Sequence, residues 1–267
     1  MSDADISVIT VVLNDVSGLR KTIDSVLSQK YTNIQHIIVD GGSTDGSQTL
    51  ANENSTVHVV SMKDGGIYQG MQRGAELASA PFIMFVNSSD QLEGSDNLRK
   101  SIQQMRQSKS LWGFGPILED TMRSSLRLSS SSGEITLNNI VSRKTFIPFP
   151  VVIMDRAEFF RVGGFKFDYK IAGDFDLIVR LTQSSLPIRW DYPLVKFSAG
   201  GISYTKPVTA WKEEHTIRVL NLNLNVFEQI LSYLKFIKRI LRWLAGKFLD
   251  VLQSMGIFGQ IHWRDRS

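Results

Sequence analysis

Apolar positions in the first hundred residues alternate between short continuous runs and helical stripes. Residues 82–86 are apolar without a break and lead into Asn-Ser-Ser-Asp, while residues 6–13 and 34–39 are apolar, β-branched runs that contain two polar residues each. Between the first two runs in the chain, residues 19–26 repeat apolar side chains at the spacing of an amphipathic helix. Continuous runs of this length are typical of strands buried on both faces of a parallel sheet. The pattern therefore predicts an α/β fold with a mostly parallel, doubly wound sheet.

Acidic residues follow three of the predicted strands. Asp40 ends the second strand, Asp64 follows a third strand at 57–61, and Asp90 follows the central strand. In open α/β sheets, ligands bind outside the carboxyl ends of the strands. Three carboxylates at one sheet edge repel one another unless a cation or a hydroxyl-rich ligand lies among them. Each of these aspartates, taken alone, also fits a turn or a helix cap.

Composition narrows the class of protein. The chain has 267 residues, 42% of them hydrophobic and 21% charged, enough for one large α/β domain with an appendage. It has no cysteine, which excludes disulfides and thiolate metal sites. The acidic N-terminus lacks the pattern of a signal peptide. No apolar run reaches the roughly 18 residues of a spanning helix, so a cytoplasmic protein is expected.

Two phosphate-binding motifs are missing. No G-x-G-x-x-G follows the first strand, and no G-x-x-x-x-G-K-[ST] occurs anywhere in the chain. Dinucleotide-binding and P-loop functions are thereby excluded. A phosphate group bound at this sheet would have to be met by a cation or by lysine and arginine side chains.

Three segments resemble one known family. They are residues 6–14 (ISVITVVLN), residues 37–47 with the run D-G-G-S-T-D-G-S, and Asn-Ser-Ser-Asp at 87–90. They are similar to the nucleotide-sugar domain of family 2 inverting glycosyltransferases, which have the GT-A fold. Residues 64–74 resemble the subgroup that builds bacterial polysaccharides, including colanic-acid-type enzymes. The resemblance covers about residues 5–205 and implies a Rossmann-like, mostly parallel sheet flanked by helices.

The resemblance assigns donor-binding roles to residues of the first half. Asp40 corresponds to the residue that hydrogen-bonds the base of the donor nucleotide, and Thr10 and Asn14 line the same pocket. Asp64 stands where the family has an acidic contact to the nucleoside. Arg73, on the following helix, is a candidate contact of the diphosphate, and a solvated helix charge is an equal alternative.

The same resemblance implies a divalent metal. Asp90 matches the last acid of the family's D-x-D-like motif, which binds Mg²⁺ or Mn²⁺. This chain has Ser89 where relatives often have aspartate, so Ser89 is kept as a donor contact and Asp90 as the metal ligand. One carboxylate binds such ions weakly, so the donor diphosphate would have to supply much of the coordination.

A second acidic constellation lies at Asp174 and Asp176. Both fall in the first turn of a predicted helix, where they suit cap and dipole roles, and Arg180 is placed as the i,i+4 partner of Asp176. The segment also resembles the family's (E/A)-D-x-D-L…R-L motif, whose first aspartate is the catalytic base. That resemblance makes Asp174 the base and Asp176 its support. Later in the chain, His215 is either a surface helix histidine or, as in some relatives, a metal ligand.

The tail is a basic amphipathic helix. Residues 226–252 repeat apolar side chains at spacings of three and four, while Lys235, Lys238, Arg239 and Arg242 cluster elsewhere on the helical wheel. Residues 216–267 hold eight Lys/Arg and three Asp/Glu, a balance of +5. This pattern favours a helix lying on an anionic membrane surface. A helix packed on the catalytic domain or on a protein partner is the alternative.

The sequence thus predicts a GT-A glycosyltransferase domain at 1–210, with a nucleotide-sugar half (about 1–110) and an acceptor half (about 111–210), and a helical tail at 211–267. The expected reaction moves a sugar from a UDP- or GDP-linked donor to an acceptor hydroxyl. A lipid-linked glycan at the inner face of a bacterial membrane is the expected acceptor. One alternative is a nucleotidyltransferase, which would show a glycine-rich basic loop at 14–20. The other is a non-catalytic nucleotide-sugar-binding subunit, against which Asp174, Asp176 and the Gly200-Gly201 loop argue.

Overall fold

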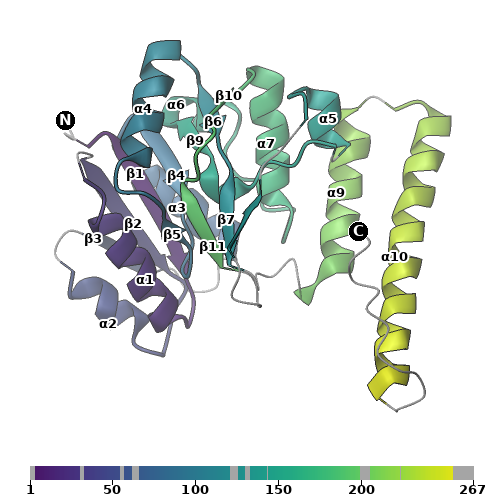
Figure 1. The fold of residues 1–267 in the computed structure, drawn as a ribbon, viewed down its shortest axis with the longest axis horizontal. Coiled ribbons are helices and arrows are strands. Elements are labelled where there is room, and N and C mark those ends of the chain that lie inside the picture. Colours follow the sequence, from purple (N-terminus) through teal and green to yellow (C-terminus); the bar gives the residue numbers. More distant parts are fainter. Residues whose placement is uncertain are drawn as a thin grey trace. The chain divides into compact units, whose positions relative to one another are not determined.

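The computed structural model divides the chain into two compact units, Met1–Lys206 and Pro207–Ser267 (Figure 1). The sequence prediction places this boundary at residue 210. The structure describes the following residues: 4–30, 33–54, 57–61, 66–120, 126–129, 133–142, 144–198, 205–222 and 224–254.

Two sheets form the framework of the first unit. Within the described residues, the larger sheet has seven strands in the order β10-β6-β9-β4-β1-β2-β3, and the smaller has four in the order β5-β11-β7-β8. Strands β1 to β4 of the larger sheet are parallel, and β9 runs antiparallel between β4 and β6. The strands are β1 (Ile6–Val12), β2 (Ile34–Asp40), β3 (Val57–Ser61), β4 (Phe82–Phe85), β5 (Gln91–Leu92), β6 (Trp112–Phe114), β7 (Ile117–Asp120), β8 (Leu126–Ser129), β9 (Ile153–Asp155), β10 (Ile188–Arg189) and β11 (Val195–Ser198). The predicted mostly parallel sheet is confirmed.

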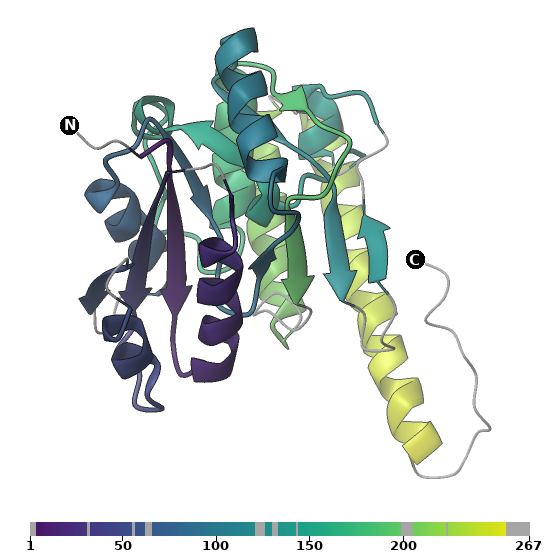
Figure 2. The ribbon, with the colours of Figure 1, turned by 60° about the vertical axis from the view of Figure 1, so that its left-hand side comes forward.

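Helices connect these strands and cover the larger sheet on both faces (Figures 1 and 2). In the first unit they are α1 (Val16–Leu27), α2 (Ser47–Asn52), α3 (Ile67–Leu77), α4 (Asn97–Ser108), α5 (Leu137–Val141), the short 3₁₀ helix η1 (Phe149–Val151), α6 (Arg156–Arg161) and α7 (Gly173–Ser184).

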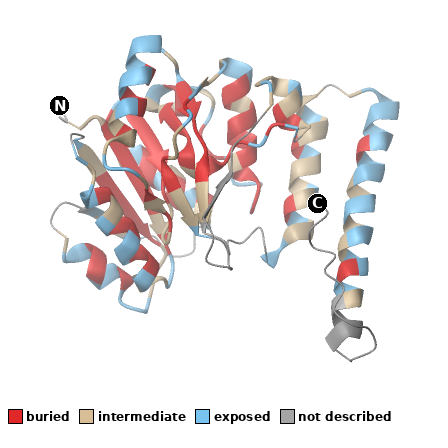
Figure 3. Ribbon diagram, viewed as in Figure 1, coloured by how far each residue is buried: buried red, intermediate tan, exposed pale blue. Residues whose placement is uncertain are grey.

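The central strands are buried on both faces because a different helix packs on each. On one face, Leu19 and Ile23 of α1 cluster with Val12 and Ile38. On the other face α3 approaches so closely that a Cβ added at Gly74 would lie 2.3 Å from a methyl carbon of Ile9. Figure 3 shows the resulting core as a band of buried residues through these strands. Burial on two sides is the physical reason that these strands are continuous apolar runs.

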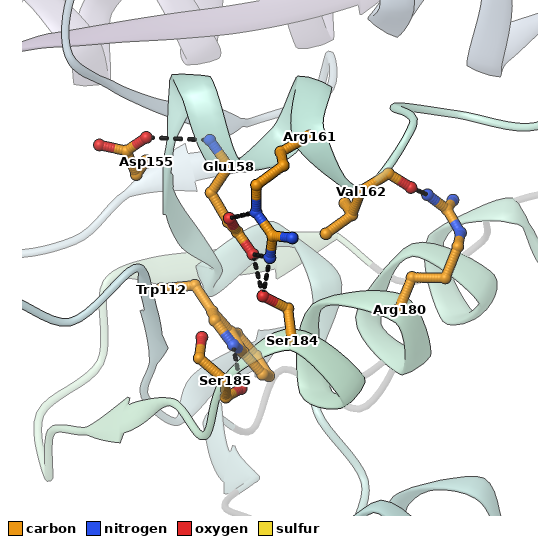
Figure 4. A network of polar contacts seen from close by, with 8 residues as sticks. All are labelled: Trp112, Asp155, Glu158, Arg161, Val162, Arg180, Ser184 and Ser185. Atoms are coloured by element: carbon orange, nitrogen blue, oxygen red, sulfur yellow. Dashed lines mark hydrogen bonds and ion pairs between the residues drawn. The ribbon is translucent and has the colours of Figure 1, made fainter.

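A polar network connects α6 with α7 behind the site (Figure 4). Glu158 is only 3% exposed and accepts two hydrogen bonds from Arg161, at 2.6 and 2.7 Å, and another from Ser184. Arg161 and Ser184 lower the pKa of Glu158 through these hydrogen bonds. The indole N–H of Trp112 in β6 donates to the Ser185 carbonyl at the end of α7. These contacts hold α7, which carries the second acidic constellation, against the sheet.

The second unit contains two described helices, α9 (Pro207–Asn221) and α10 (Val226–Ser254), and the predicted C-terminal helix is confirmed. Asn225 caps α10: its side chain accepts from the Glu228 N–H, while the Glu228 carboxylate accepts from the Asn225 N–H. Across the described part of the chain, no helix combines the length and apolarity needed to cross a bilayer.

Candidate active site

Asp40 lies at the carboxyl end of β2 with its side chain fully buried. One carboxylate oxygen accepts hydrogen bonds from the backbone N–H groups of Gly42 and Ser43, at 3.1 and 3.0 Å. The other oxygen, Oδ1, is buried and has no hydrogen-bond partner among the described residues. A buried acceptor without a donor is costly, so Asp40 Oδ1 is suited to a donor supplied by a ligand.

The loops after β1 and β2 are tied together by side chains. Asn14, which has a left-handed backbone with φ 51°, accepts from the Thr44 N–H at 2.8 Å through its side chain. Asp45 accepts from the N–H groups of Val16 and Ser47. The Ser47 hydroxyl also bonds Asp45, and this bond is the first cause that lowers the pKa of Asp45. The D-G-G-S-T-D-G-S run therefore forms one rigid rim beside Asp40.

Ser89 belongs to the loop after β4, and its hydroxyl donates to Asp15 Oδ2 at 2.8 Å. Its φ of 75° lies in the left-handed region. Asp15 also caps α1 by accepting from the Gly18 N–H. A Cβ at Gly18 would lie 2.1 Å from both Asp15 Oδ2 and Ser89 Oγ, so only glycine lets these two approach.

Asp90 is buried, with 4% of its surface exposed. Its Oδ1 accepts one hydrogen bond, 3.1 Å long, from the Ser198 N–H at the end of β11. Desolvation raises the pKa of Asp90 to about 7, and the Ser198 bond opposes this shift. A cation beside Asp90 would offset the cost of burying its charge, so the residue fits one ligand position of a divalent metal ion. Within the described residues, no group of three or more His, Asp or Glu side chains forms a metal site, around Asp90 or at any other place.

A polar cavity of about 280 Å³ lies next to the Ser89 loop. Its lining comes from α1, from the loop after β4, and from the antiparallel pair of β5 and β11. The residues that line it are Lys21, Ser89, Gln91, Lys196, Phe197 and Ser198. Two lysines and two serine hydroxyls make this cavity suitable for an anion.

Asp174 lies in the first turn of α7 and is partly buried. Its Oδ1 is 3.3 Å from the hydroxyl of Tyr68, which also donates to the Ile171 carbonyl. Burial, followed by the charge of Asp174, raises the pKa of Tyr68, so this hydroxyl stays protonated. A Cβ at Gly173 would lie 2.8 to 3.0 Å from the Tyr68 ring carbons. Asp174 Oδ1 also accepts a 2.7 Å hydrogen bond from the Phe175 N–H, and this bond together with the Tyr68 hydroxyl orients the carboxylate.

Asp176 faces away from solvent, with 1% exposed, and forms the i,i+4 ion pair with Arg180 that the sequence predicts. The same guanidinium donates to the carbonyls of Val162 and Gly164, at 2.6 and 2.7 Å. Asp176 therefore anchors the turn before α7, and its support of Asp174 is indirect.

Two predicted donor contacts lie away from the loops. Thr10 is fully buried on the α1 face of the sheet, where its hydroxyl donates to the Val86 carbonyl and contacts His36 Nε2. Thr10 precedes the strand end by two residues, so its side chain belongs to the core and does not line a pocket. Arg73 is exposed on α3 and forms a surface ion pair with Glu76 at 3.3 Å. The structure thus favours the alternative of a solvated helix charge.

Three further predictions concern Asp64, the Gly200-Gly201 loop and His215. Asp64 and the Gly200-Gly201 loop lie outside the described residues. His215 belongs to α9 of the second unit, where its ring stacks on Phe236 and Nδ1 is 3.2 Å from the Ser232 hydroxyl.

Four residues of the site were not singled out from the sequence. Asp15 binds Ser89, Tyr68 positions Asp174, and Lys21 and Lys196 line the cavity. The contact of Asp15 with Ser89 spans 74 positions, and that of Tyr68 with Asp174 spans 106. In the sequence, the lack of a phosphate-binding loop was the one signal that lysine side chains would be needed near a bound phosphate.

The fold and the loops at the carboxyl ends of β1, β2 and β4 are those of a GT-A-fold glycosyltransferase. The family model for glycosyl transferase family 2 matches residues 7–165, more than half of the chain. The chain belongs to this family, and it is a glycosyltransferase.

Curated relatives share most of the chain. An uncharacterized glycosyltransferase of Mycobacterium tuberculosis (strain H37Rv) is 29% identical over 211 residues, which cover 76% of this chain and 78% of the relative. A PGL/p-HBAD biosynthesis glycosyltransferase of Mycobacterium bovis (strain BCG / Pasteur) is 26% identical over 212 residues, covering 74% of this chain and 79% of the relative.

Solved structures share the fold at lower identity. Staphylococcus aureus TarS 1–349, in complex with UDP-GlcNAc, has a TM-score of 0.68 and 17% identity, covering 88% of this chain and 72% of that one. The mannosyltransferase PcManGT from Pyrobaculum calidifontis, in complex with GDP-Man and Mn²⁺, has a TM-score of 0.63 and 13% identity, covering 98% of this chain and 77% of that one. At these identities the likeness concerns the fold alone.

Proposed function

We propose that the protein is an inverting glycosyltransferase that moves a sugar from a UDP- or GDP-linked donor to an acceptor hydroxyl. The observation that carries the proposal is the placement of Asp174. It is a partly buried carboxylate in the first turn of α7, positioned by the protonated hydroxyl of Tyr68, in a chain of glycosyl transferase family 2.

The donor base binds at Asp40. Both uracil and guanine carry ring N–H groups, and Asp40 Oδ1 is a buried acceptor that needs such a donor. The rim formed by Asn14 and Thr44 holds the surrounding loops in place before the donor arrives. Preorganisation of this kind lowers the entropic cost of binding.

The donor diphosphate binds near Ser89, where positively charged groups neutralise its charge. Lys21 and Lys196 line the adjacent cavity and attract the phosphate oxygens. Asp90 would hold a divalent ion, Mg²⁺ or Mn²⁺, which when bound neutralises charge on the leaving diphosphate. PcManGT, which shares the fold, is described in complex with Mn²⁺.

Asp174 serves as the general base. Its carboxylate takes the proton of the acceptor hydroxyl while the acceptor oxygen bonds to the anomeric carbon of the sugar. In the same displacement the bond from that carbon to the diphosphate oxygen breaks, and the nucleoside diphosphate leaves with the electron pair. Attack opposite to the leaving group inverts the anomeric configuration. Tyr68 keeps Asp174 oriented by hydrogen bonding, and Asp176 keeps the preceding turn in place.

The acceptor is a lipid-linked glycan used in bacterial surface polysaccharide synthesis, and transfer takes place at the cytoplasmic face of the membrane. Two observations support this part of the proposal. One curated relative is named for PGL/p-HBAD biosynthesis, and the second unit carries a basic helix with exposed apolar side chains.

Calorimetric titration of UDP and GDP, each with and without Mn²⁺, tests the donor site. One nucleotide should bind, and binding should tighten with Mn²⁺. Asp40→Asn should abolish binding because its amide presents N–H groups to the donor base, whereas Asp24→Asn, an exposed change of the same charge on α1, should not. Binding of neither nucleotide would favour the non-catalytic alternative.

Transfer assays then test the base. Asp174→Asn should bind the nucleotide as the wild type does and lower turnover by about 10²- to 10⁴-fold, the usual contribution of a general base. Near-normal turnover by this variant would show that another group accepts the proton.

A further inference from the structure

The second unit contains a helix with two different apolar faces. One face of α10 packs on α9: the Ser232 hydroxyl lies 3.2 Å from His215 Nδ1, and Phe236 stacks on the same imidazole with ring centroids 5.4 Å apart. Arg239 continues this face, with its guanidinium 4.5 Å from the centre of the Trp211 ring. These residues recur at spacings of four and three, so they occupy one side of the helix.

The other apolar face of α10 is exposed to solvent. At about 100° per residue, its members fall within roughly a third of the helical wheel, nearly opposite the side that packs on α9. Each is 49% to 74% exposed, and Figure 3 shows this helix mostly in the colour of exposed residues. We call these residues the outer face: Val226, Ile230, Leu234, Leu241, Leu244 and Phe248.

Positive charge borders the outer face. Lys238 and Arg242 lie along one edge of it, Lys235 lies further round on the same side, and Lys247 lies on the other edge. Among the described side chains of α10, Glu228 is the one acid, and it is engaged in the cap at Asn225. The helix therefore presents an apolar stripe framed by cations, over about 33 Å of its length at 1.5 Å per residue.

This combination matches one kind of partner. Apolar side chains of an interfacial helix enter the boundary between headgroups and acyl chains, while lysine and arginine remain at the level of the phosphates. Two copies of this chain meeting through the same face would bring their cationic edges together, which is unfavourable in a symmetric contact. An anionic lipid surface supplies both the apolar layer and the opposite charge.

We propose that α10 docks the protein on an anionic lipid surface through the outer face, with Lys235, Lys238 and Arg242 against headgroup phosphates. The packing on α9 leaves the outer face available, which distinguishes it from an ordinary core helix. Lipid binding by α10 would explain the membrane location given in the proposed function. It rests on that function only for the biological role of the binding. Lipid binding requires neither donor nor transfer, so the two proposals fail separately.

Flotation of the full-length protein with vesicles tests the inference. Vesicles of phosphatidylcholine mixed with phosphatidylglycerol should carry the protein, and vesicles of phosphatidylcholine alone should carry far less. Binding should weaken with added salt because exposed charges are screened. Equal binding to both vesicles, or no binding to either, would overturn the proposal.

Variants assign the binding to the helix. Reversal of Lys235, Lys238 and Arg242 to glutamate should lower partitioning by at least about 100-fold, since each cation near such a surface contributes about five-fold. The triple change of Lys30, Lys109 and Lys144 to glutamate, three exposed positions in the first unit, alters the net charge by the same amount and should change partitioning less than five-fold.

The apolar contribution is tested with Leu234→Ser and Leu241→Ser together, with circular dichroism to verify that α10 stays helical. These changes should lower partitioning by more than ten-fold. Unchanged partitioning would refute the role of the outer face. Sedimentation without vesicles tests whether the outer face instead binds a second copy of the chain. If the wild type is a dimer and the two serine substitutions make it a monomer, the proposal is overturned.

Discussion

Replacement of Asp90 by asparagine should make the folded protein more stable at alkaline pH. Burial raises the pKa of Asp90 from 3.8 to about 7. In the window between these values the folded protein holds a proton that the unfolded chain has released, so stability falls as pH rises through it. At about 1.4 kcal/mol per pKa unit, the ionised Asp90 costs about 4 kcal/mol above pH 7.

The asparagine variant removes this cost but brings one of its own. Its amide can accept from the Ser198 N–H as Asp90 does, whereas its NH₂ group is buried without a known acceptor, which costs about 1–3 kcal/mol. A net gain of about 1–3 kcal/mol at pH 8 is therefore expected. The difference from the wild type should grow by about 1.4 kcal/mol per pH unit between pH 4 and 7.

Urea unfolding of both proteins between pH 4 and 8, in buffer with a chelator, measures this difference. Asp24→Asn is the matched control, since it removes the same charge from an exposed position of α1. A difference between wild type and Asp90→Asn that stays constant from pH 5 to 8 would refute the desolvation argument. Such a result would mean that water or another group solvates the carboxylate.

Three further predictions concern the surroundings of the site. Gly173→Ala should lower stability by about 1–3 kcal/mol, because the clash with the Tyr68 ring exceeds the gain in helix propensity; turnover should fall with nucleotide affinity unchanged in calorimetry. Arg180→Ala should destabilise the fold by about 1–3 kcal/mol, measured by urea unfolding, because the carbonyls of Val162 and Gly164 lose their donor while the buried Asp176 carboxylate keeps only its ion pair with Lys166 at 3.6 Å; a loss below 1 kcal/mol would contradict that arrangement. Burial lowers the pKa of His36 to about 4, so the stability it contributes is present above pH 6.5 and lost as pH falls toward 4. His36→Leu should reduce the loss of unfolding free energy between pH 7 and 4 by up to about 3 kcal/mol. If the dependence of stability on pH is unchanged, His36 does not contribute to it.

Much of the fold could be predicted from the sequence because its signals are local. Strands β1 and β4 are buried on both faces, so most of their positions are apolar, and the same holds for residues 37–39 of β2. The i,i+4 pair of Asp176 and Arg180 follows from helix geometry alone. Asp40 and Asp90 stand out because each follows an apolar run, and in a parallel sheet such positions meet at one edge.

Side-chain orientation and environment were decided by the tertiary structure. Thr10 looked like a pocket residue, yet it points into the core, where it donates to the Val86 carbonyl 76 positions away. For Arg73 the sequence left a diphosphate contact and a solvated helix charge equally open, and the structure shows it exposed beside Glu76. Whether each of these side chains is buried or exposed depends on which face of its strand or helix is covered by other helices. The neighbouring residues in the sequence do not encode that.

The chemistry of the site depends on contacts between distant segments. The Ser198 N–H reaches Asp90 across 108 positions, and Tyr68 reaches Asp174 across 106. The sequence by itself determined which carboxylates stand at the ends of the strands and at the start of α7. Only the folded chain decided how strongly each is desolvated and which group orients it, because desolvation is the sum of all neighbours that exclude water.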